Sequence, residues 1–237
     1  MITLCARGGS KGIPGKNIKL INGKPLIYYT LNTAQKFKDA LEDADIVLST
    51  DSEEIRTVVK SFGFDIDSNY TRPARLASDE AGKIAVIKDI LNYSENSNKK
   101  KYEIVLDLDI TSPFRNVSDL QNALDKLLKN PEAYNIFSVS EAKRSPYFNM
   151  VEEKPDGYFA LCKEGVFFAR QAAPNVYDMN ASFYFYRKSF FEKDYQTAIT
   201  DKSLVYEISH SCFDLDHPID FEFMSFLLVN NKLDFEL

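Results

Sequence analysis

The sequence predicts an α/β fold with a mainly parallel central sheet. Short apolar segments of strand length alternate with amphipathic segments of helix length along most of the 237 residues, which is the pattern of a sheet covered by helices. Segments rich in glycine, proline and small polar residues separate these elements. The length suits one large domain, or one large domain with a small insertion.

The first third of the chain is expected to run in the order β-α-β-α-β. Residues 2–6 form a short apolar strand, and a glycine-rich segment leads from it to a helix that begins near Pro25, because proline fits the first turn of a helix. Residues 45–51 predict a second strand. Ser52 is followed by acidic residues, as in a capping box, and opens the second helix; residues 64–67 predict a third strand.

The alternation continues to the end of the chain with one interruption. Residues 140–180 contain prolines, glycines and aromatic clusters without helical spacing, so we expect an excursion from the sheet there. Residues 1–139 and 181–237 then form the main α/β domain, and residues 96–101 form a solvated loop. The remaining expected elements are a helix over 83–93, a strand over 103–108, a helix over 118–128, strands over 136–139 and 181–186, a helix over 189–192, a strand over 204–208 and a helix over 219–229.

The composition excludes several classes of protein. A formal net charge of -6 argues against a nucleic-acid-binding protein. Two histidines cannot make a three-histidine zinc site, and three widely spaced cysteines without a CxxC motif argue against a disulfide framework or a zinc ribbon. No apolar run approaches the roughly 20 residues that span a membrane, and the N-terminus lacks the features of a signal peptide. We therefore expect a cytoplasmic protein without a membrane or nucleic-acid partner.

The loop after the first strand is the first place to look for a ligand, because open α/β sheets bind ligands at the carboxyl ends of their strands. Residues 1–38 contain seven Lys or Arg and no acid, and Arg7, Lys11 and Lys16 lie among glycines in this loop. Glycines let backbone N–H groups approach an anion closely, so the loop suits a polyphosphate. Ser10 and Asn17 rule out the Walker spacing. The alternative interpretation is an ordinary flexible surface loop.

Six motifs in the same order closely resemble the acylneuraminate (CMP-sialic acid) cytidylyltransferase family, and they cover nearly the whole chain. The motifs are Leu4 to Asn17 with Asn22 to Leu26, Ser49 to Ser52, Arg72 to Asp79, Thr111 to Arg115, Arg170-Gln171, and Phe213 to Asp216. The resemblance implies a Rossmann-like nucleotidyltransferase fold with a small inserted dimerisation domain at 140–180. It also implies a homodimeric enzyme that uses Mg²⁺ to join CTP to a nine-carbon 2-keto sugar acid, releasing pyrophosphate, for cell-surface or flagellar glycan biosynthesis.

The same resemblance assigns residues to the two substrates. Arg7, Lys16 and Asp216 are the catalytic candidates. Arg115 and Arg170 suit a sugar carboxylate because a guanidinium fork matches a carboxylate in two hydrogen bonds. The nucleotide-binding set is Ala6, Arg7, Gly9, Ser10, Lys11, Lys16, Asn17, Arg72 and Ser78, and the sugar-binding set is Asp109, Ser112, Arg115, Phe148, Asn149, Arg170, Gln171, Tyr177 and Asn180.

Asp214 and Asp216 are the expected Mg²⁺ ligands. They stand at i and i+2 at the end of an expected strand, hence on one side of it, and carboxylate oxygens suit this ion. By itself such a pair also fits two solvated acids or the cap of the last helix. The family places its metal on this motif, so the resemblance favours the metal site.

Position 109 departs from the family pattern. Members that activate sialate typically have glutamine in a Gln-Pro-Thr-Ser-Pro turn, whereas this chain has Asp109-Ile110-Thr111-Ser112-Pro113. A carboxylate only accepts hydrogen bonds, so it suits a sugar with an extra N–H or O–H, as in the bacterial legionaminate branch that the surrounding residues also resemble. The alternatives are a deoxy-octulosonate or sugar-1-phosphate nucleotidyltransferase, and a nucleotide-binding module without catalysis.

Overall fold

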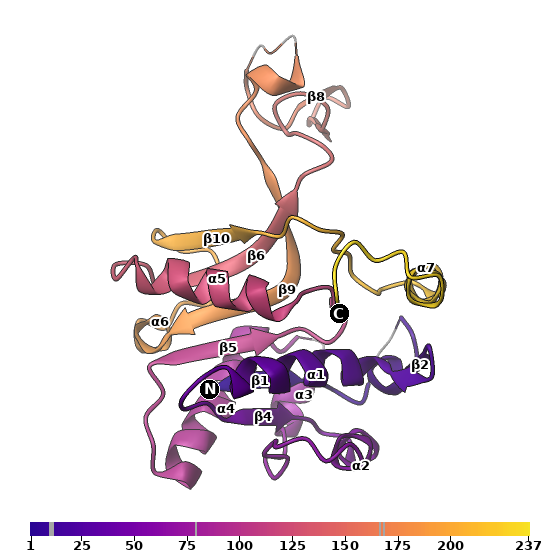
Figure 1. Cartoon of the computed structure of the whole chain (residues 1–237). Coiled ribbons are helices and arrows are strands. Elements are labelled where there is room, and N and C mark those ends of the chain that lie inside the picture. The colour runs from indigo at the N-terminus through magenta and orange to yellow at the C-terminus, as the bar shows by residue number, and fades with distance from the viewer. Residues whose placement is uncertain (10–11, 79, 166, 168) are drawn as a thin grey trace.

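A six-stranded sheet forms the centre of the protein (Figure 1). The computed structural model describes residues 1–9, 12–78, 80–165, 167 and 169–237. The strand order is β10-β6-β9-β5-β1-β4; β9 is antiparallel to both neighbours and the other pairings are parallel. The expected mainly parallel sheet is confirmed. The strands are β1 Ile2–Cys5, β4 Ile46–Ser49, β5 Ile104–Leu108, β6 Asn135–Glu141, β9 Tyr177–Arg187 and β10 Ser203–Glu207.

Helices cover both faces of this sheet because its strands are apolar on both sides. Leu48 on β4 packs into one core, whereas its neighbour Val47 packs into a second core. Side chains alternate across a strand, so a continuous apolar run fills both faces. The first core contains α1 and α5, and the second contains α4 and α6. The helices are α1 Leu26–Asp39, α2 Glu53–Lys60, α3 Ala74–Ala77, α4 Lys83–Asn98, α5 Val117–Leu128, α6 Lys188–Glu192 and α7 Pro218–Val229.

Three local expectations are wrong. Residues 64–67 are not a strand, because only Asp67 reaches β4, in an isolated bridge to Val47. Residues 213–216 are likewise not a strand. The helix expected to end near residue 93 continues to Asn98, so α4 includes part of the run expected to be a loop.

A short hairpin, β2 Leu20–Ile21 and β3 Lys24–Pro25, was not predicted. Asn22 and Gly23 form its turn with φ angles of 49° and 74°. These left-handed values are the ones that an Asn-Gly hairpin turn requires. The Asn22-Gly23 dipeptide could have indicated this hairpin, but the strands on either side are too short to show an alternation of apolar and polar residues.

The segment between β6 and β9 projects away from the sheet (Figure 1). It contains the antiparallel pair β7 Val151–Glu153 and β8 Phe159–Leu161, and the 3₁₀ turn η2 Arg170–Ala172. β6 ends at Glu141 and β9 begins at Tyr177, so the projection is slightly shorter than the expected 140–180. It exposes large apolar side chains, including Tyr158 at 72% of its surface.

The C-terminal residues are fastened to α5 by His210. Its Nε2 lies 2.9 Å from Asp119 Oδ2, and its ring stacks on Phe235 with the centroids 3.7 Å apart. Burial alone would lower the pKa of His210, but the hydrogen bonds to Asp119 and to the Ser211 carbonyl raise it above its ordinary value. Protonated His210 therefore stabilises the fold.

We expect the free energy of unfolding to fall as the pH rises through the folded-state pKa of His210. Its contribution is complete below the unfolded-state pKa of about 6.5 and is lost above the raised value. His210→Gln should remove this dependence, whereas His217→Gln, at the exposed start of α7, should keep it. Urea denaturation between pH 6 and pH 8 checks this, and an equal slope for His210→Gln and the parent would contradict it.

Candidate active site

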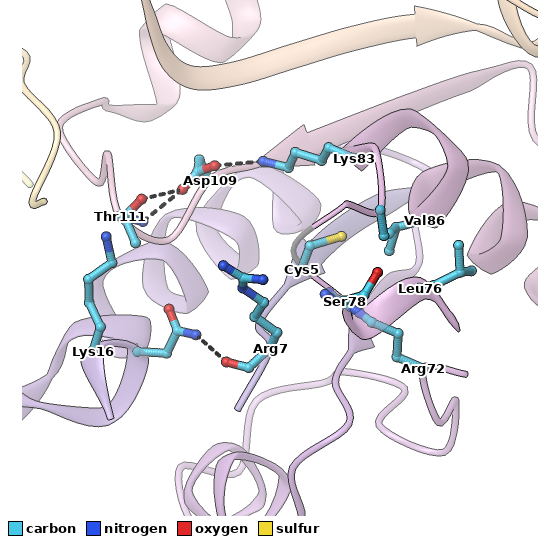
Figure 2. Close-up of a pocket in the computed structure, with 12 residues that line it drawn as sticks. Cys5, Arg7, Lys16, Arg72, Leu76, Ser78, Lys83, Val86, Asp109 and Thr111 are labelled. Atoms are coloured by element: carbon cyan, nitrogen blue, oxygen red, sulfur yellow. Dashed lines mark hydrogen bonds and ion pairs between the residues drawn. The ribbon is translucent and has the colours of Figure 1, made fainter. Parts of the chain in front are cut away.

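A cleft of about 330 Å³ opens at the carboxyl ends of β1 and β5 (Figure 2). Parallel strands bring these ends together, which is why residues distant in the sequence meet here. Arg7 and Lys16 come from the first loop, Arg72 and Ser78 from the region of α3, and Asp109 from the end of β5. The lining residues are Cys5, Arg7, Lys16, Asn17, Arg72, Leu76, Ser78, Ala81, Lys83, Val86, Asp109 and Thr111.

The first loop is held in place by two polar contacts from its own residues. The backbone N–H of Gly8 donates to Asp51 Oδ1 at 2.8 Å, and Asn17 Nδ2 donates to the Arg7 carbonyl at 3.0 Å. A Cβ at position 8 would lie 3.0 Å from Ser52 Cβ, so a glycine is needed for this approach. Figure 2 shows the Arg7 side chain extending into the cleft from the anchored backbone. Ala6 is fully buried and Gly9 is exposed. The candidates Ser10 and Lys11 lie outside the described residues.

Arg72 serves the structure as well as lining the cleft. Its Nε donates to Ser49 Oγ at 3.0 Å and a terminal nitrogen donates to the Ser49 carbonyl at 2.9 Å. The side chain is buried, and it ties the loop before α3 to the end of β4. Ser78, just after α3, lines the same wall. Arg72 therefore both stabilises the loop before α3 and lines the cleft.

The segment with the two candidate metal ligands lies against the first loop. Lys16 Nζ is 2.9 Å from Asp216 Oδ1, and a Cβ on Gly12 would lie 3.3 Å from the Asp216 carbonyl. The Leu215 N–H donates to the Thr111 carbonyl at 2.8 Å, and the Leu215 side chain is buried. These contacts fix the segment although it is not a strand. The basic loop and the acidic pair thus form one surface.

Asp214 is the acid whose surroundings suit a cation. Its Oδ1 is buried and has no hydrogen-bond partner among the described residues. The pKa of Asp214 is raised: burial is the largest cause, a hydrogen bond with Ser112 and the charge of Lys16 oppose it, and the nearby carboxylates of Asp109 and Asp216 add to it. A cation would relieve both effects. The described residues contain no group of three or more His, Cys, Asp or Glu side chains that could hold a metal, but Mg²⁺ is commonly held by one or two carboxylates plus substrate phosphates.

Asp109 is fixed at the edge of the cleft. Its Oδ1 accepts from the Thr111 N–H at 2.8 Å and from Thr111 Oγ1 at 2.9 Å, and its Oδ2 lies 2.6 Å from Lys83 Nζ (Figure 2). Burial alone would raise the pKa of Asp109, but Lys83 and the Thr111 hydrogen bonds lower it to about 2. Asp109 is therefore a carboxylate at neutral pH.

Lys83 and Asp107 were missed by the sequence analysis. Lys83 is the first residue of α4 and reaches both Asp109 and the fully buried Asp107, 2.8 Å away. The two carboxylates outweigh the effect of burial and hold the pKa of Lys83 well above its ordinary value. The available signal was Asp107 itself, because an acid inside an apolar buried strand requires a partner.

Arg115 does not contact the cleft, contrary to expectation. Its side chain has no exposed surface. The guanidinium donates to the carbonyls of Ser112, Ser182 and Asp109 and to Thr30 Oγ1 at 2.7 to 2.8 Å. A sugar cannot reach this group, so Arg115 instead shapes the turn that carries Asp109. Burial lowers its pKa to about 10, which leaves it charged at neutral pH.

Replacing Arg115 with methionine should lower the free energy of unfolding by about 3 kcal/mol, because several buried acceptors lose their donor. Arg75→Met is the control: Arg75 is exposed and its ion pair in the described part of the chain is with Asp89, so its loss should cost at most about 1 kcal/mol. Denaturant unfolding measures both values. If both variants lost the same small amount of unfolding free energy, the hydrogen bonds of Arg115 would not stabilise the fold.

The other expected sugar-binding residues whose side chains the structure describes do not line the cleft. Ser112 and Asn180 are buried and bonded to each other, Ser112 Oγ donating to the Asn180 carbonyl at 2.7 Å. Gln171 and Tyr177 line a different hollow of about 580 Å³ at the base of the projection, and none of the described residues lines both hollows. Phe148 and Asn149 are exposed on the projection, and the Arg170 side chain lies outside the described part of the structure. Among the nine expected sugar-binding residues, Asp109 is the one whose described side chain lines the cleft.

No helix within the described ranges is both long and apolar enough to cross a membrane.

Known proteins resemble this chain over almost its full length. The chain is 36% identical over 233 residues to post-translational flagellin modification protein B of Campylobacter coli, covering 98% of this chain and 96% of that protein. It is also 36% identical over 228 residues to CMP-N,N'-diacetyllegionaminic acid synthase of Campylobacter jejuni, covering 96% and 94%. A solved structure of CMP:2-keto-3-deoxy-manno-octonic acid synthetase with CTP superposes with a TM-score of 0.68 at 17% identity, covering 97% and 98%, which supports the fold. The family model described as "Cytidylyltransferase" matches residues 1–232, and the chain belongs to that family.

Proposed function

We propose that this protein is a CMP-nonulosonate synthetase. It transfers CMP from CTP to a nine-carbon 2-keto sugar acid of the legionaminate or sialate type and releases pyrophosphate, supplying a cell-surface or flagellar glycan. The observation that carries the proposal is the cleft, which Arg7, Lys16 and the ionised Asp109 line together in a chain of the cytidylyltransferase family. The named activity of the legionaminate relative supports this choice of sugar acid.

The cations of the first loop are suited to the nucleotide. When a sugar hydroxyl attacks the α-phosphorus of CTP in line, negative charge grows on the non-bridging oxygens and on the departing pyrophosphate. Arg7 and Lys16 bind and stabilise that charge, and the anchored backbone holds them in place before the reaction. Asn17 fixes the loop and Arg72 with Ser78 forms the opposite wall, beside the base and ribose.

Asp214 and Asp216 would hold Mg²⁺. The buried, unpartnered oxygen of Asp214 and the exposed carboxylate of Asp216 supply the hard oxygen donors that this ion prefers. When bound, Mg²⁺ neutralises phosphate charge and lowers the pKa of the attacking hydroxyl. Lys16 would exchange its contact with Asp216 for the phosphates when the nucleotide binds, and the ion pair orients both groups before that.

We also propose a cytoplasmic homodimer formed through the projection. The projection exposes apolar side chains, among them Val151 and Phe159, which a second copy would cover. The sugar-binding candidates Arg170, Gln171 and Tyr177 belong to the same region rather than to the cleft. Dimerisation would bring them to the partner's cleft. Sedimentation of the parent and of Phe159→Asp tests the assembly.

The proposed function is tested by measuring pyrophosphate release with CTP, Mg²⁺ and a panel of sugar acids of the sialate, legionaminate, pseudaminate and deoxy-octulosonate types. Release should require all three components and a nonulosonic acid. If the deoxy-octulosonate acid were the one acid of the panel that supports pyrophosphate release, the protein would instead be a deoxy-octulosonate cytidylyltransferase. CTP binding without release from any acid would favour a non-catalytic nucleotide-binding module.

Position 109 is expected to select the sugar. Asp109→Gln should raise kcat/KM for N-acetylneuraminate and lower it for a sugar acid with two acetamido groups, because an amide can donate a hydrogen bond that a carboxylate cannot. The expected change in the ratio of the two kcat/KM values is about tenfold or more. An Asp109→Gln enzyme with the selectivity of the parent would refute this role.

A further inference from the structure

We propose that Lys83 determines the specificity of the cleft as a positioning residue: Asp107 fixes Lys83, and Lys83 holds the Asp109 carboxylate oriented to accept a hydrogen bond from an N–H or O–H of the sugar acid. This inference rests on the proposed function and explains how the same cleft selects its sugar. Lys83 lines the cleft, and we assign its effect to its contact with Asp109 rather than to a contact with the sugar.

Three contacts fix the side chain of Lys83. Its Nζ lies 2.6 Å from Asp109 Oδ2 and 2.8 Å from Asp107 Oδ2, and it faces the Tyr184 ring 5.9 Å from the centroid. Asp107 is fully buried in β5 and also accepts from Thr3 Oγ1 at 3.0 Å. A lysine held by two carboxylates and an aromatic ring is a fixed donor. It therefore fixes Asp109 in turn.

The contacts of Asp109 leave room for one further donor. An ionised carboxylate offers about four acceptor sites. Thr111 fills two sites on Oδ1, and Lys83 fills one on Oδ2. The remaining site is on Oδ2 of a residue that lines the cleft. Asp109 can therefore recognise a donor such as an amide N–H, whereas a group with only acceptors finds no partner there.

Charge explains why the lysine is required. Asp107, Asp109 and Lys83 carry two negative charges and one positive charge. The titratable groups of Cys5, Arg115, Tyr184 and Asp214 also interact electrostatically with members of this cluster. Without Lys83, two carboxylates would remain close together in a partly buried site, which favours protonation of one of them. A protonated Asp109 would donate a hydrogen bond. The cleft would then lose its preference for a donor on the sugar.

The test compares four variants with the parent. Lys83→Met removes the cation, and Lys83→Arg keeps it. Asp107→Asn/Lys83→Met has the same net charge as the parent but no cation beside Asp109. The double variant Lys83→Met/Asp109→Gln tests whether Lys83 acts only through Asp109. The readout is kcat/KM for a sugar acid with two acetamido groups divided by kcat/KM for N-acetylneuraminate, with the KM for CTP as a check on the nucleotide site.

The expected results separate positioning from a structural role. Lys83→Met should lower the selectivity ratio about tenfold with the KM for CTP unchanged, and Lys83→Arg should retain the parent ratio. In the charge-matched pair Asp109 stays ionised but is no longer oriented by a cation, so the ratio should recover only in part. The combined variant should match Asp109→Gln alone. The inference would be overturned if Lys83→Met lowered kcat/KM equally for both sugar acids, or if the charge-matched pair recovered the full selectivity ratio of the parent. If Lys83→Met fails to fold, the selectivity ratio of the Asp107→Asn/Lys83→Met variant still tests the inference.

A measurement without substrate separates this inference from the proposed function. ¹³C NMR titration of the free protein should place the Asp109 pKa below the ordinary carboxyl value, at about 2, in the parent and similarly low in Lys83→Arg. In Lys83→Met the Asp109 pKa should be higher by about one unit or more. An unchanged Asp109 pKa in Lys83→Met would overturn the inference even in an active enzyme. A parent that is inactive with every sugar acid would instead overturn the proposed function, while the titration would still decide the role of Lys83.

Discussion

Lys16→Ala should lower kcat by about 10²-fold to 10³-fold, the loss seen when one group that stabilises a developing negative charge is removed. Lys16 lines the cleft, and its side chain is only 14% exposed, so water cannot fully replace its charge. The KM for the sugar acid should change little, because Lys16 lies on the nucleotide side. Steady-state kinetics with each substrate varied in turn measures both effects.

Lys24→Ala provides the matched control for this change. Lys24 lies in the same basic region, but it is exposed in β3 and faces the Tyr28 ring rather than the cleft. Its replacement should leave kcat nearly unchanged. Equal losses of kcat and of sugar affinity in Lys16→Ala, or a similar loss in Lys24→Ala, would mean that Lys16 does not act on the phosphates.

Asp214→Asn should make the protein more stable and much less active. Burial and neighbouring carboxylates raise the pKa of Asp214, so the charged form destabilises the folded state above the ordinary carboxyl pKa, and a neutral amide removes that cost. Activity should fall about 10²-fold or more, as for other groups that stabilise transition-state charge. The Mg²⁺ concentration for half-maximal activity should rise.

Unfolding at pH 7 and a Mg²⁺ titration of activity check the two halves of this prediction. Glu222→Gln is the control, because Glu222 is an exposed acid on the nearby helix α7 and should affect neither quantity. An Asp214→Asn protein with the activity and Mg²⁺ requirement of the parent would remove Asp214 from the proposed metal site. A loss of stability would show that its carboxylate is needed for folding.

Much of the fold was predictable because it depends on local patterns. The apolar runs of β1, β4 and β5 predicted strands buried on both faces, and Ser52 marked the start of α2, where its side chain accepts from the Ile55 N–H. Residues 64–67 show the limit of this reasoning. Their composition suits a strand, but pairing is decided by the neighbouring strand, which Asp67 alone reaches.

The site was predictable in outline and not in its contacts. The basic first loop and the pair Asp214 and Asp216 do lie together, as the fold requires. Arg115 was misjudged because a guanidinium suits a carboxylate and a set of backbone carbonyls equally well, and only the packing of β9 shows that it is buried. Lys83 was missed because its partners lie 24 and 26 residues further along the chain.

The most direct test of the central claim is mass spectrometry of the product formed by the parent protein from CTP, Mg²⁺ and a nonulosonic acid. We predict a CMP-sugar in which the sugar acid is joined to the α-phosphate, formed in equal amount with pyrophosphate, and formed most rapidly from an acid with two acetamido groups. Absence of any CMP-sugar with every nonulosonic acid offered would contradict the account.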